Sequence, residues 1–196
     1  MILKNGEHFE EKIIEDEKRR TELIDGVYYF YPEASFGHGM SMGSIHRIFS
    51  NYLRGKKCVV TPDGVNLFLD EENTFRPDIM VICNLDIIKH NGIHGTPDLV
   101  VEILSPSTAK NDRSKKKDIY ERYGVKEFWI VDVANRSIEV YLNDGKKFHL
   151  DEVYVVFRNY EKEEMTTEEI WSKENVKVSL FDDLVVNLEE VFENII

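Results

Sequence analysis

The sequence predicts an α/β fold built on a mixed sheet, and three observations support this fold class. Short apolar runs of strand length are interleaved with helix-like stretches. A strand–helix–strand unit over 98–133 indicates a parallel crossover. Hairpin-like pairs of runs lie on both sides of that unit, which adds antiparallel strands. The 196 residues are 42% hydrophobic, enough for one core, so we expect a single domain over 1–196.

Composition restricts the location and the possible partners of the protein. The formal net charge is -12, so binding to nucleic acid would need a local basic patch. Cys58 and Cys83 lie in strand-like apolar runs, where we expect buried free thiols rather than a disulfide. The start of the chain lacks a signal-peptide pattern, and no stretch has the length and apolarity of a membrane span. We therefore expect a cytoplasmic protein with no membrane partner.

The first half of the chain is expected to contain two helices and several short strands. Residues 8–20 are charged and favour a helix, and Thr21–Tyr31 is typical of a hairpin that turns at Asp25-Gly26. Apolar residues follow helical spacing over Ser41–Leu53, and Gly55 ends that helix. Strands are predicted at Cys58–Val60, Val65–Leu69 and Phe75–Cys83.

The second half begins with the strand Asp98–Leu104, which leads into a helix from Ser105 to about Tyr123. Gly124 stands where a helix-ending glycine is expected. The acidic stretch Tyr160–Glu169 is expected to be a solvated loop. Further strands are predicted at Glu127–Val133, Ser137–Leu142, Val153–Phe157 and Val176–Leu180, with a final helix over Asn187–Ile196.

Glu102 is the residue of greatest chemical interest because it interrupts the apolar run Leu99–Leu104. A carboxylate in a buried strand must be paired, hydrogen-bonded or bound to a metal, since burying it alone is costly. A structural salt bridge, or a strand near the sheet edge, would explain Glu102 equally well. Asp78 occupies a similar setting and could instead be a strand-start acid held by backbone N–H groups. Two such carboxylates side by side repel unless they share a cation or a proton.

Lys116 is the lysine that helical spacing directs toward these acids. It precedes Ile119 and Tyr120 by three and four residues, so it shares their apolar face. Lys115 and Lys117 should point sideways or to solvent. The alternative is a lysine that lays its stem on the core and extends its charge to water. Tyr120 is expected to be a packing residue.

A local excess of positive charge surrounds this helix. Residues 104–126 carry seven basic residues and three acids, although the chain as a whole is acidic. A solvated helix face is the common reason for such a run, but a phosphate backbone would require the same charge. The candidate contacts to nucleic acid are Lys110, Arg113, Lys115 and Lys117.

Other polar residues give weaker signals. Glu22, which precedes the first turn, could reach the site but could equally be a surface acid. His46 is expected to pack in its helix, and Asn91-Gly92 between His90 and His94 argues against a helical zinc pair. The sequence contains no phosphate-binding glycine loop, nucleophile elbow or Cys-x-x-Cys motif.

The combined motifs resemble those of the Uma-type putative restriction endonucleases, a family of the PD-(D/E)XK nuclease superfamily that was long a domain of unknown function. The resemblance covers most of the chain, and its combined pattern is more specific than any one motif. The matching segments are Glu22–Gly26, Phe75–Ile79, Pro97–Thr108, Asp112, Lys116, Tyr120 and Gly124–Asp132.

The resemblance implies a restriction-endonuclease-like core, with a mixed central sheet flanked by helices. It assigns Asp78 and Glu102 as the two acids of the motif. The simplest superfamily pattern has a lysine two residues after the second acid, where this chain has Leu104. The resemblance implies that the following helix supplies the lysine instead, at the position of Lys116.

The leading hypothesis is therefore a DNA endonuclease that depends on Mg²⁺ or Mn²⁺. Asp78, Glu102 and the backbone carbonyl of Ile103 would hold the metal, with Glu22 as a further ligand. Lys116 would position the attacking water or neutralise the transition state. Cleavage of both strands usually takes two active sites, which suggests a homodimer. The rival hypotheses are an inactive nuclease fold that binds nucleic acid or a protein partner, and a hydrolase of small phosphoesters.

Overall fold

The computed structural model describes residues 20–195, and its centre is a six-stranded mixed sheet. The strand order is β12-β11-β10-β9-β6-β3, and only β9 and β10 run parallel. The predicted mixed sheet with a parallel crossover is thus confirmed. The helix expected over 8–20 lies outside the described residues, apart from Arg20. The strand bounds are β3 (Val59–Pro62), β6 (Ile79–Ile82), β9 (Leu99–Ile103), β10 (Glu127–Asp132), β11 (Ser137–Asn143) and β12 (Phe148–Val155).

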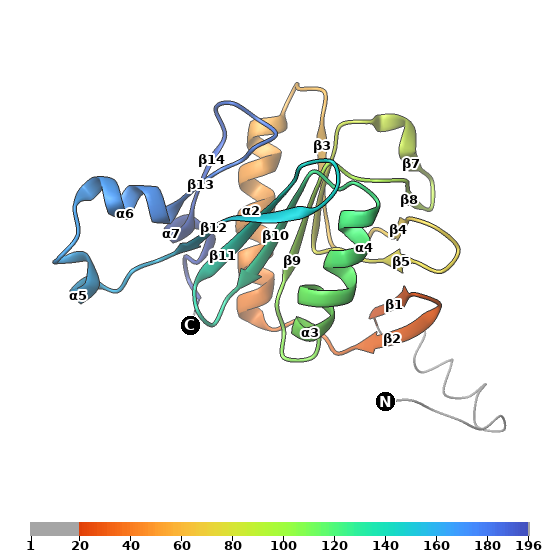
Figure 1. Cartoon of the computed structure of the whole chain (residues 1–196), viewed down its shortest axis with the longest axis horizontal. Coiled ribbons are helices and arrows are strands. Elements are labelled where there is room, and N and C mark those ends of the chain that lie inside the picture. The colour runs from red at the N-terminus through yellow and green to blue at the C-terminus, as the bar shows by residue number, and fades with distance from the viewer. Residues whose placement is uncertain (1–19, 196) are drawn as a thin grey trace.

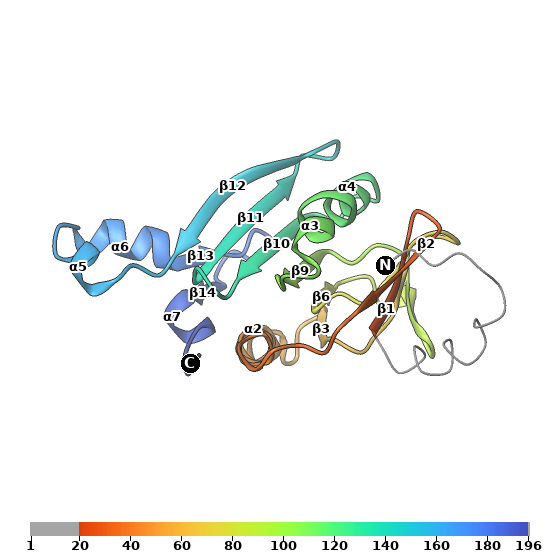
Figure 2. The same ribbon diagram turned by 90° about the horizontal axis from the view of Figure 1, so that it is seen from below.

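Helices cover both faces of this sheet, as Figures 1 and 2 show. α2 (Phe36–Leu53) lies on one face, and α3 (Ala109–Asn111) with α4 (Lys117–Arg122) lies on the other. α2 begins five residues before the predicted start because Ser35 caps it, its hydroxyl accepting the His38 N–H. Among the residues that the structure describes, no helix is long and apolar enough to cross a bilayer.

A second six-stranded sheet, in the order β2-β1-β5-β4-β8-β7, lies beside the first. The predicted hairpin with its Asp25-Gly26 turn is confirmed as β1 and β2. The predicted strand Phe75–Cys83 is divided between β5 and β6, because Pro77 has no N–H for a sheet hydrogen bond. The sequence reasoning missed β7 and β8. The bounds are β1 (Arg20–Ile24), β2 (Val27–Tyr31), β4 (Leu67–Phe68), β5 (Thr74–Phe75), β7 (Ile88–Lys89) and β8 (Gly92–His94), with a 3₁₀ turn at Leu85–Ile87.

The C-terminal part corrects one prediction and shortens two others. The acidic segment predicted to be a loop contains α5 and the start of α6, because Thr166 and Glu169 form a capping box. The strand predicted from Val176 ends earlier, and Asn187 caps the last helix. Ile196 lies outside the described residues. The bounds are α5 (Asn159–Lys162), α6 (Thr167–Glu174), β13 (Asn175–Lys177), β14 (Val185–Asn187) and α7 (Leu188–Val191).

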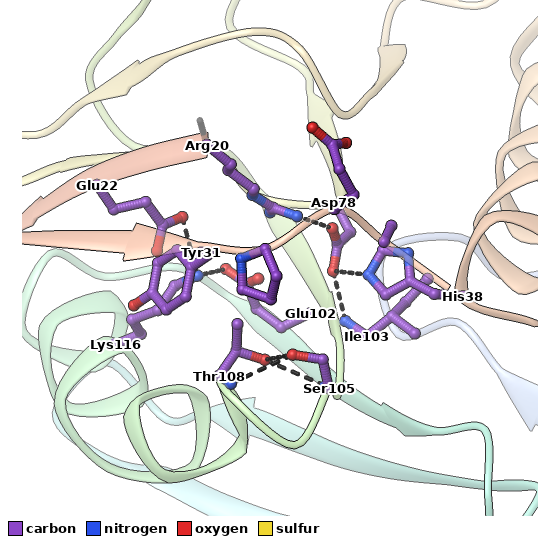
Figure 3. A pocket seen from close by; sticks show the side chains of 13 residues that line it. Arg20, Glu22, Tyr31, His38, Asp78, Glu102, Ile103, Ser105, Thr108 and Lys116 are labelled. Carbon is purple, nitrogen blue, oxygen red and sulfur yellow. Dashed lines mark hydrogen bonds and ion pairs between the residues drawn. The ribbon is translucent and has the colours of Figure 1, made fainter. Parts of the chain in front are cut away.

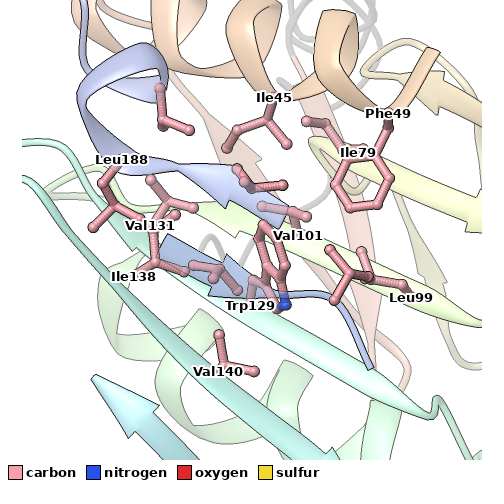
Figure 4. Close-up of a cluster of buried hydrophobic side chains, with 14 of the residues drawn as sticks. Ile45, Phe49, Ile79, Leu99, Val101, Trp129, Val131, Ile138, Val140 and Leu188 are labelled. Carbon is pink, nitrogen blue, oxygen red and sulfur yellow. The ribbon is translucent and has the colours of Figure 1, made fainter. Parts of the chain in front are cut away.

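The two faces of β9 belong to different hydrophobic clusters. Leu99, Val101 and Ile103 pack in the cluster that includes α2, α7 and Trp129, as seen in Figure 4. Val100 points to the opposite face, into a cluster formed with α4 and the second sheet. Glu102 follows Val100 by two residues, so strand alternation directs its side chain to that second face.

Cys58 and Cys83 form a disulfide, so the prediction of free thiols is wrong. β3 and β6 pair with Val59 opposite Ile82, and the next step of this register sets the cysteines opposite each other. Their Cα atoms are 4.1 Å apart, close enough to be bridged. The sequence showed two strand-like runs but not that these runs are neighbours.

Reduction of this disulfide is expected to lower the free energy of unfolding by about 3 kcal/mol, since the bond closes a loop of about 25 residues in the unfolded chain. Urea unfolding with and without dithiothreitol measures the difference. The double variant Cys58→Ser/Cys83→Ser serves as the control and should not respond to the reductant. Unchanged stability of the reduced wild type would contradict the prediction.

Candidate active site

Asp78 and Glu102 meet on one face of the main sheet. β6 pairs with β9 so that Ile79 lies opposite Val101, and the next step of this register places Asp78 opposite Glu102. Both side chains are buried, with exposures of 1% and 2%. The structure thus brings together the two acids that the sequence singled out, while their chemical roles remain predictions.

Three groups hold the carboxylate of Asp78 in place (Figure 3). Its Oδ2 accepts the backbone N–H of Ile103 at 2.7 Å and lies 3.3 Å from Nε2 of His38. Its Oδ1 accepts Nη1 of Arg20 at 2.9 Å. Burial raises the pKa of Asp78, but the contacts with His38, Arg20 and the Ile103 amide outweigh it and lower the pKa below its ordinary value. Asp78 is therefore a carboxylate kept ionised inside the protein.

Lys116 lies at the centre of the acidic cluster, with 1% exposure. Its Nζ is 2.7 Å from Glu102 Oε1, 3.1 Å from Glu22 Oε1 and 3.4 Å from Asp112 Oδ1. The predicted helix is divided at this point by a π-helical turn, Asp112–Lys116. Such turns insert an extra residue into a helix and are frequent at functional sites. The prediction that helical spacing aims Lys116 inward is confirmed.

Glu102 shares its Oε1 between Lys116 and the hydroxyl of Tyr120, which donates to it at 2.7 Å. Burial raises the pKa of Glu102 well above its ordinary value; Lys116 opposes this rise, whereas Asp112 and Asp78 add to it. Tyr120 also packs against Phe75 at 5.2 Å between ring centroids. It is thus a packing residue, as predicted, but it also orients the second acid.

The carboxylates surround a small cavity of about 30 Å³, comparable to the volume of one water molecule. Glu22, Asp78, Glu102 and Lys116 all contribute to its lining. The cluster contains four carboxylates, including Asp112, but only two permanently charged cations, Arg20 and Lys116. When all four acids are ionised, this imbalance favours an added cation.

The chemistry of these donors fits a hard divalent cation, which prefers carboxylate and carbonyl oxygens. Glu22 Oε2 is buried without a hydrogen-bond partner, so one ligand atom in the cluster is uncommitted. Within residues 20–195, however, no three His, Cys, Asp or Glu side chains already form a ligand set. Binding a cation would therefore require Arg20 and Lys116 to move away from the carboxylates that they now contact.

Sequence reasoning missed three members of the cluster: Arg20, His38 and Asp112. Asp112 could have been found, since it precedes Lys116 by four residues and therefore lies on the same side of a helix. His38 and Arg20 gave no comparable local signal. They reach Asp78 from chain positions 40 and 58 residues away.

The four cations predicted to contact nucleic acid lie on or beside the segment that carries Lys116. Lys110, Arg113 and Lys115 are exposed, and Lys117 is half-buried, 4.5 Å above the Tyr141 ring. Arg113 is engaged with Glu139 at 2.7 Å and with Asp132 at 3.7 Å, and Lys115 donates to the Tyr29 hydroxyl at 2.8 Å. Lys110 is the most exposed candidate of this group, and the role of all four remains a prediction.

Comparison with known proteins agrees with this arrangement. An uncharacterized protein of Synechocystis sp. is 28% identical over 127 residues, which span 64% of this chain and 66% of that protein. A crystal structure described as a putative nuclease belonging to DUF820, from Anabaena variabilis, superposes with a TM-score of 0.66. That match covers 88% of this chain and 89% of the other at 16% identity, which shows a shared fold. The predicted α/β fold, a mixed sheet flanked by helices, is thus confirmed.

The family comparison covers most of the chain. The sequence model of the family Uma2, described as "Putative restriction endonuclease", matches residues 7–175. This range includes both acids, the lysine and every other member of the cluster. The chain therefore belongs to the Uma2 family of putative restriction endonucleases.

Proposed function

We propose that this chain is a DNA endonuclease that depends on Mg²⁺ or Mn²⁺ and hydrolyses phosphodiester bonds. The observation that carries the proposal is the convergence of Asp78 and Glu102 on one cavity, with Lys116 2.7 Å from Glu102. Membership in a family described as restriction endonucleases supports it. We further propose a homodimer, because cutting both strands of a duplex usually takes two active sites.

In this proposal Asp78, Glu102 and the carbonyl of Ile103 hold the cation, and Glu22 supplies a further oxygen. When bound, the cation would lower the pKa of a water and stabilise charge on the phosphate. The Ile103 N–H and His38 orient Asp78, and Tyr120 orients Glu102. These contacts keep both carboxylates aimed at the cavity without further reorganisation.

The cations of the site neutralise the substrate in this proposal. Lys116, released from part of its contact with Glu102, positions the attacking water or stabilises the charge that develops on the phosphate. Lys110, Arg113, Lys115 and Lys117 contact phosphates on either side of the scissile bond.

Nicking of supercoiled plasmid tests the proposal directly. We expect the full chain to nick plasmid with Mn²⁺ or Mg²⁺ and to lose this activity in EDTA. Asp78→Asn, which keeps the shape of the side chain, should abolish nicking because it removes the charge that attracts the cation. Equal nicking by wild type and Asp78→Asn from parallel preparations would indicate a contaminant and contradict the proposal.

A second candidate, an inactive nuclease fold that binds nucleic acid or a protein partner, is favoured by the ion pair between Arg20 and Asp78, which occupies one metal-binding oxygen. Calorimetric titration with Mn²⁺ separates the two. The endonuclease proposal expects binding heat that Asp78→Asn removes. Affinity for DNA without heat from Mn²⁺ or nicking would favour the inactive fold. Hydrolysis of bis(p-nitrophenyl) phosphate without nicking would favour a small phosphoester as substrate.

A further inference from the structure

A second cavity lies beside the edge strand β3 and outside the acidic cluster. It measures about 430 Å³ and is an open groove between β3 and the β7–β8 hairpin. Val59, Ile88 and Ile93 give it apolar walls, whereas Lys89 and His90 at the hairpin tip give it a polar side. Apolar walls with a few polar groups are typical of ligand sites of this size.

The groove leads toward the acidic cluster. β3 pairs with β6 so that Val59 lies opposite Ile82 and Pro62 lies opposite Ile79, the residue after Asp78. The groove therefore runs along β3 toward the end of β6 where Asp78 is held. Asp63, which follows Pro62, has its Oδ2 3.9 Å from Nη1 of Arg20. The same short loop thus borders both the groove and the acidic cluster.

The two segments that form the groove carry positive charge and no acid. Residues 54–62 lead into and form β3, and they contain Arg54, Lys56 and Lys57. Residues 87–97 include the hairpin, with Lys89 and His90 at its tip. Lys57, Lys89 and His90 are exposed. In a chain of net charge -12, this acid-free border fits a polyanion.

The hairpin is fixed in position as one wall of the groove. Ile93 donates its N–H to the carbonyl of Asn66 at 2.8 Å. Gly92 has a φ of +144°, and a Cβ at this position would lie 2.4 Å from the same carbonyl oxygen. Only glycine permits so close an approach of two backbones. The groove is therefore a defined feature of the fold.

We propose that this groove holds an unpaired strand of the nucleic acid that is cut at the acidic cluster, an inference that rests on the proposed function. Its apolar walls take the faces of the bases, and its positive border, including Lys57 and Lys89, follows the phosphates. A volume of about 430 Å³ suits groups of nucleotide size, whereas a duplex is too wide to enter it. The unpaired strand thus reaches Asp78 along β3.

Binding of a fluorescein-labelled oligothymidylate to the full chain tests this inference by fluorescence anisotropy in EDTA. The variant Lys57→Ala/Lys89→Ala removes two phosphate contacts. It should bind about 25-fold more weakly at 0.1 M salt and lower the slope of log affinity against log salt by about 1.4. The matched control, Lys146→Ala/Lys147→Ala, removes two exposed lysines from the β11–β12 turn and should bind as wild type does. Urea unfolding checks that both variants fold.

The outcomes separate this inference from the proposed function. Wild-type affinity and salt slope in Lys57→Ala/Lys89→Ala would overturn the groove, even if plasmid nicking is retained. Equal weakening by the control pair would also overturn it, because the loss would then reflect net charge alone. As a second measurement, amide NMR shifts on adding the oligonucleotide should include Val59, Thr61 and Gly92, and their constancy would refute the groove. A wild type that neither binds nor nicks DNA refutes both proposals.

Discussion

Replacement of Lys116 by methionine is expected to lower the free energy of unfolding by about 3–5 kcal/mol. The ammonium is buried and lies within 3.4 Å of three carboxylates, those of Glu22, Glu102 and Asp112. Methionine has a similar length but no charge, so all three acids would lose their shared partner in a site of low dielectric. Urea unfolding monitored by circular dichroism measures the loss.

Lys117→Met is the matched control for this experiment. Lys117 is the next residue and is half-buried against the Tyr141 ring, but it lies outside the acidic cluster. Its replacement should cost less than about 1 kcal/mol. Equal losses in the two variants would show that Lys116 contributes through its hydrocarbon stem and not through the carboxylates.

Replacement of Glu102 by glutamine is expected to reduce plasmid nicking on the order of a thousandfold while leaving the free energy of unfolding within about 1 kcal/mol of wild type. The amide keeps the shape of the side chain but loses the charge that attracts a cation. Stability should survive because the change also removes the repulsion that Asp112 and Asp78 exert on Glu102. Lys116 keeps Glu22 and Asp112 as partners.

Glu127→Gln is the control because Glu127 is also a buried strand glutamate. It lies on β10, bonded to the Trp129 indole at 2.7 Å and to the Ser179 amide at 2.9 Å, and it does not line the cavity. Its variant should retain wild-type nicking. Full activity in Glu102→Gln, or equal losses in both variants, would contradict the assignment of Glu102 to the chemistry.

The local pattern of the sequence was sufficient to identify Glu102 and Lys116. Side chains alternate along a strand and recur every 3.6 residues on a helix, so a single acid in β9 and a single inward lysine could be recognised without knowing their neighbours. The hairpin at Asp25-Gly26 and the parallel pair of β9 and β10 could be predicted for the same reason. Each of these features depends on residues close together in the chain.

The remaining parts of the site depend on strand register and on contacts between distant segments. The partnership of Asp78 with Glu102 requires β6 to lie beside β9 in one particular register, which only the family resemblance suggested in advance. Arg20 and His38 reach Asp78 from distant segments, and no periodic pattern encodes that approach. The Cys58–Cys83 disulfide was mispredicted for the same reason.

The sequence by itself therefore determined the fold class, the buried acid of β9 and the lysine directed toward it. The tertiary structure decided how these charges are balanced, because the pKa of Glu102 depends on burial and on Lys116, Asp112 and Asp78 together. It also decided the groove along β3, since that surface exists only where the β7–β8 hairpin packs against the edge of another sheet. Periodicity is a property of one segment, whereas charge balance and surface shape are properties of several segments packed together.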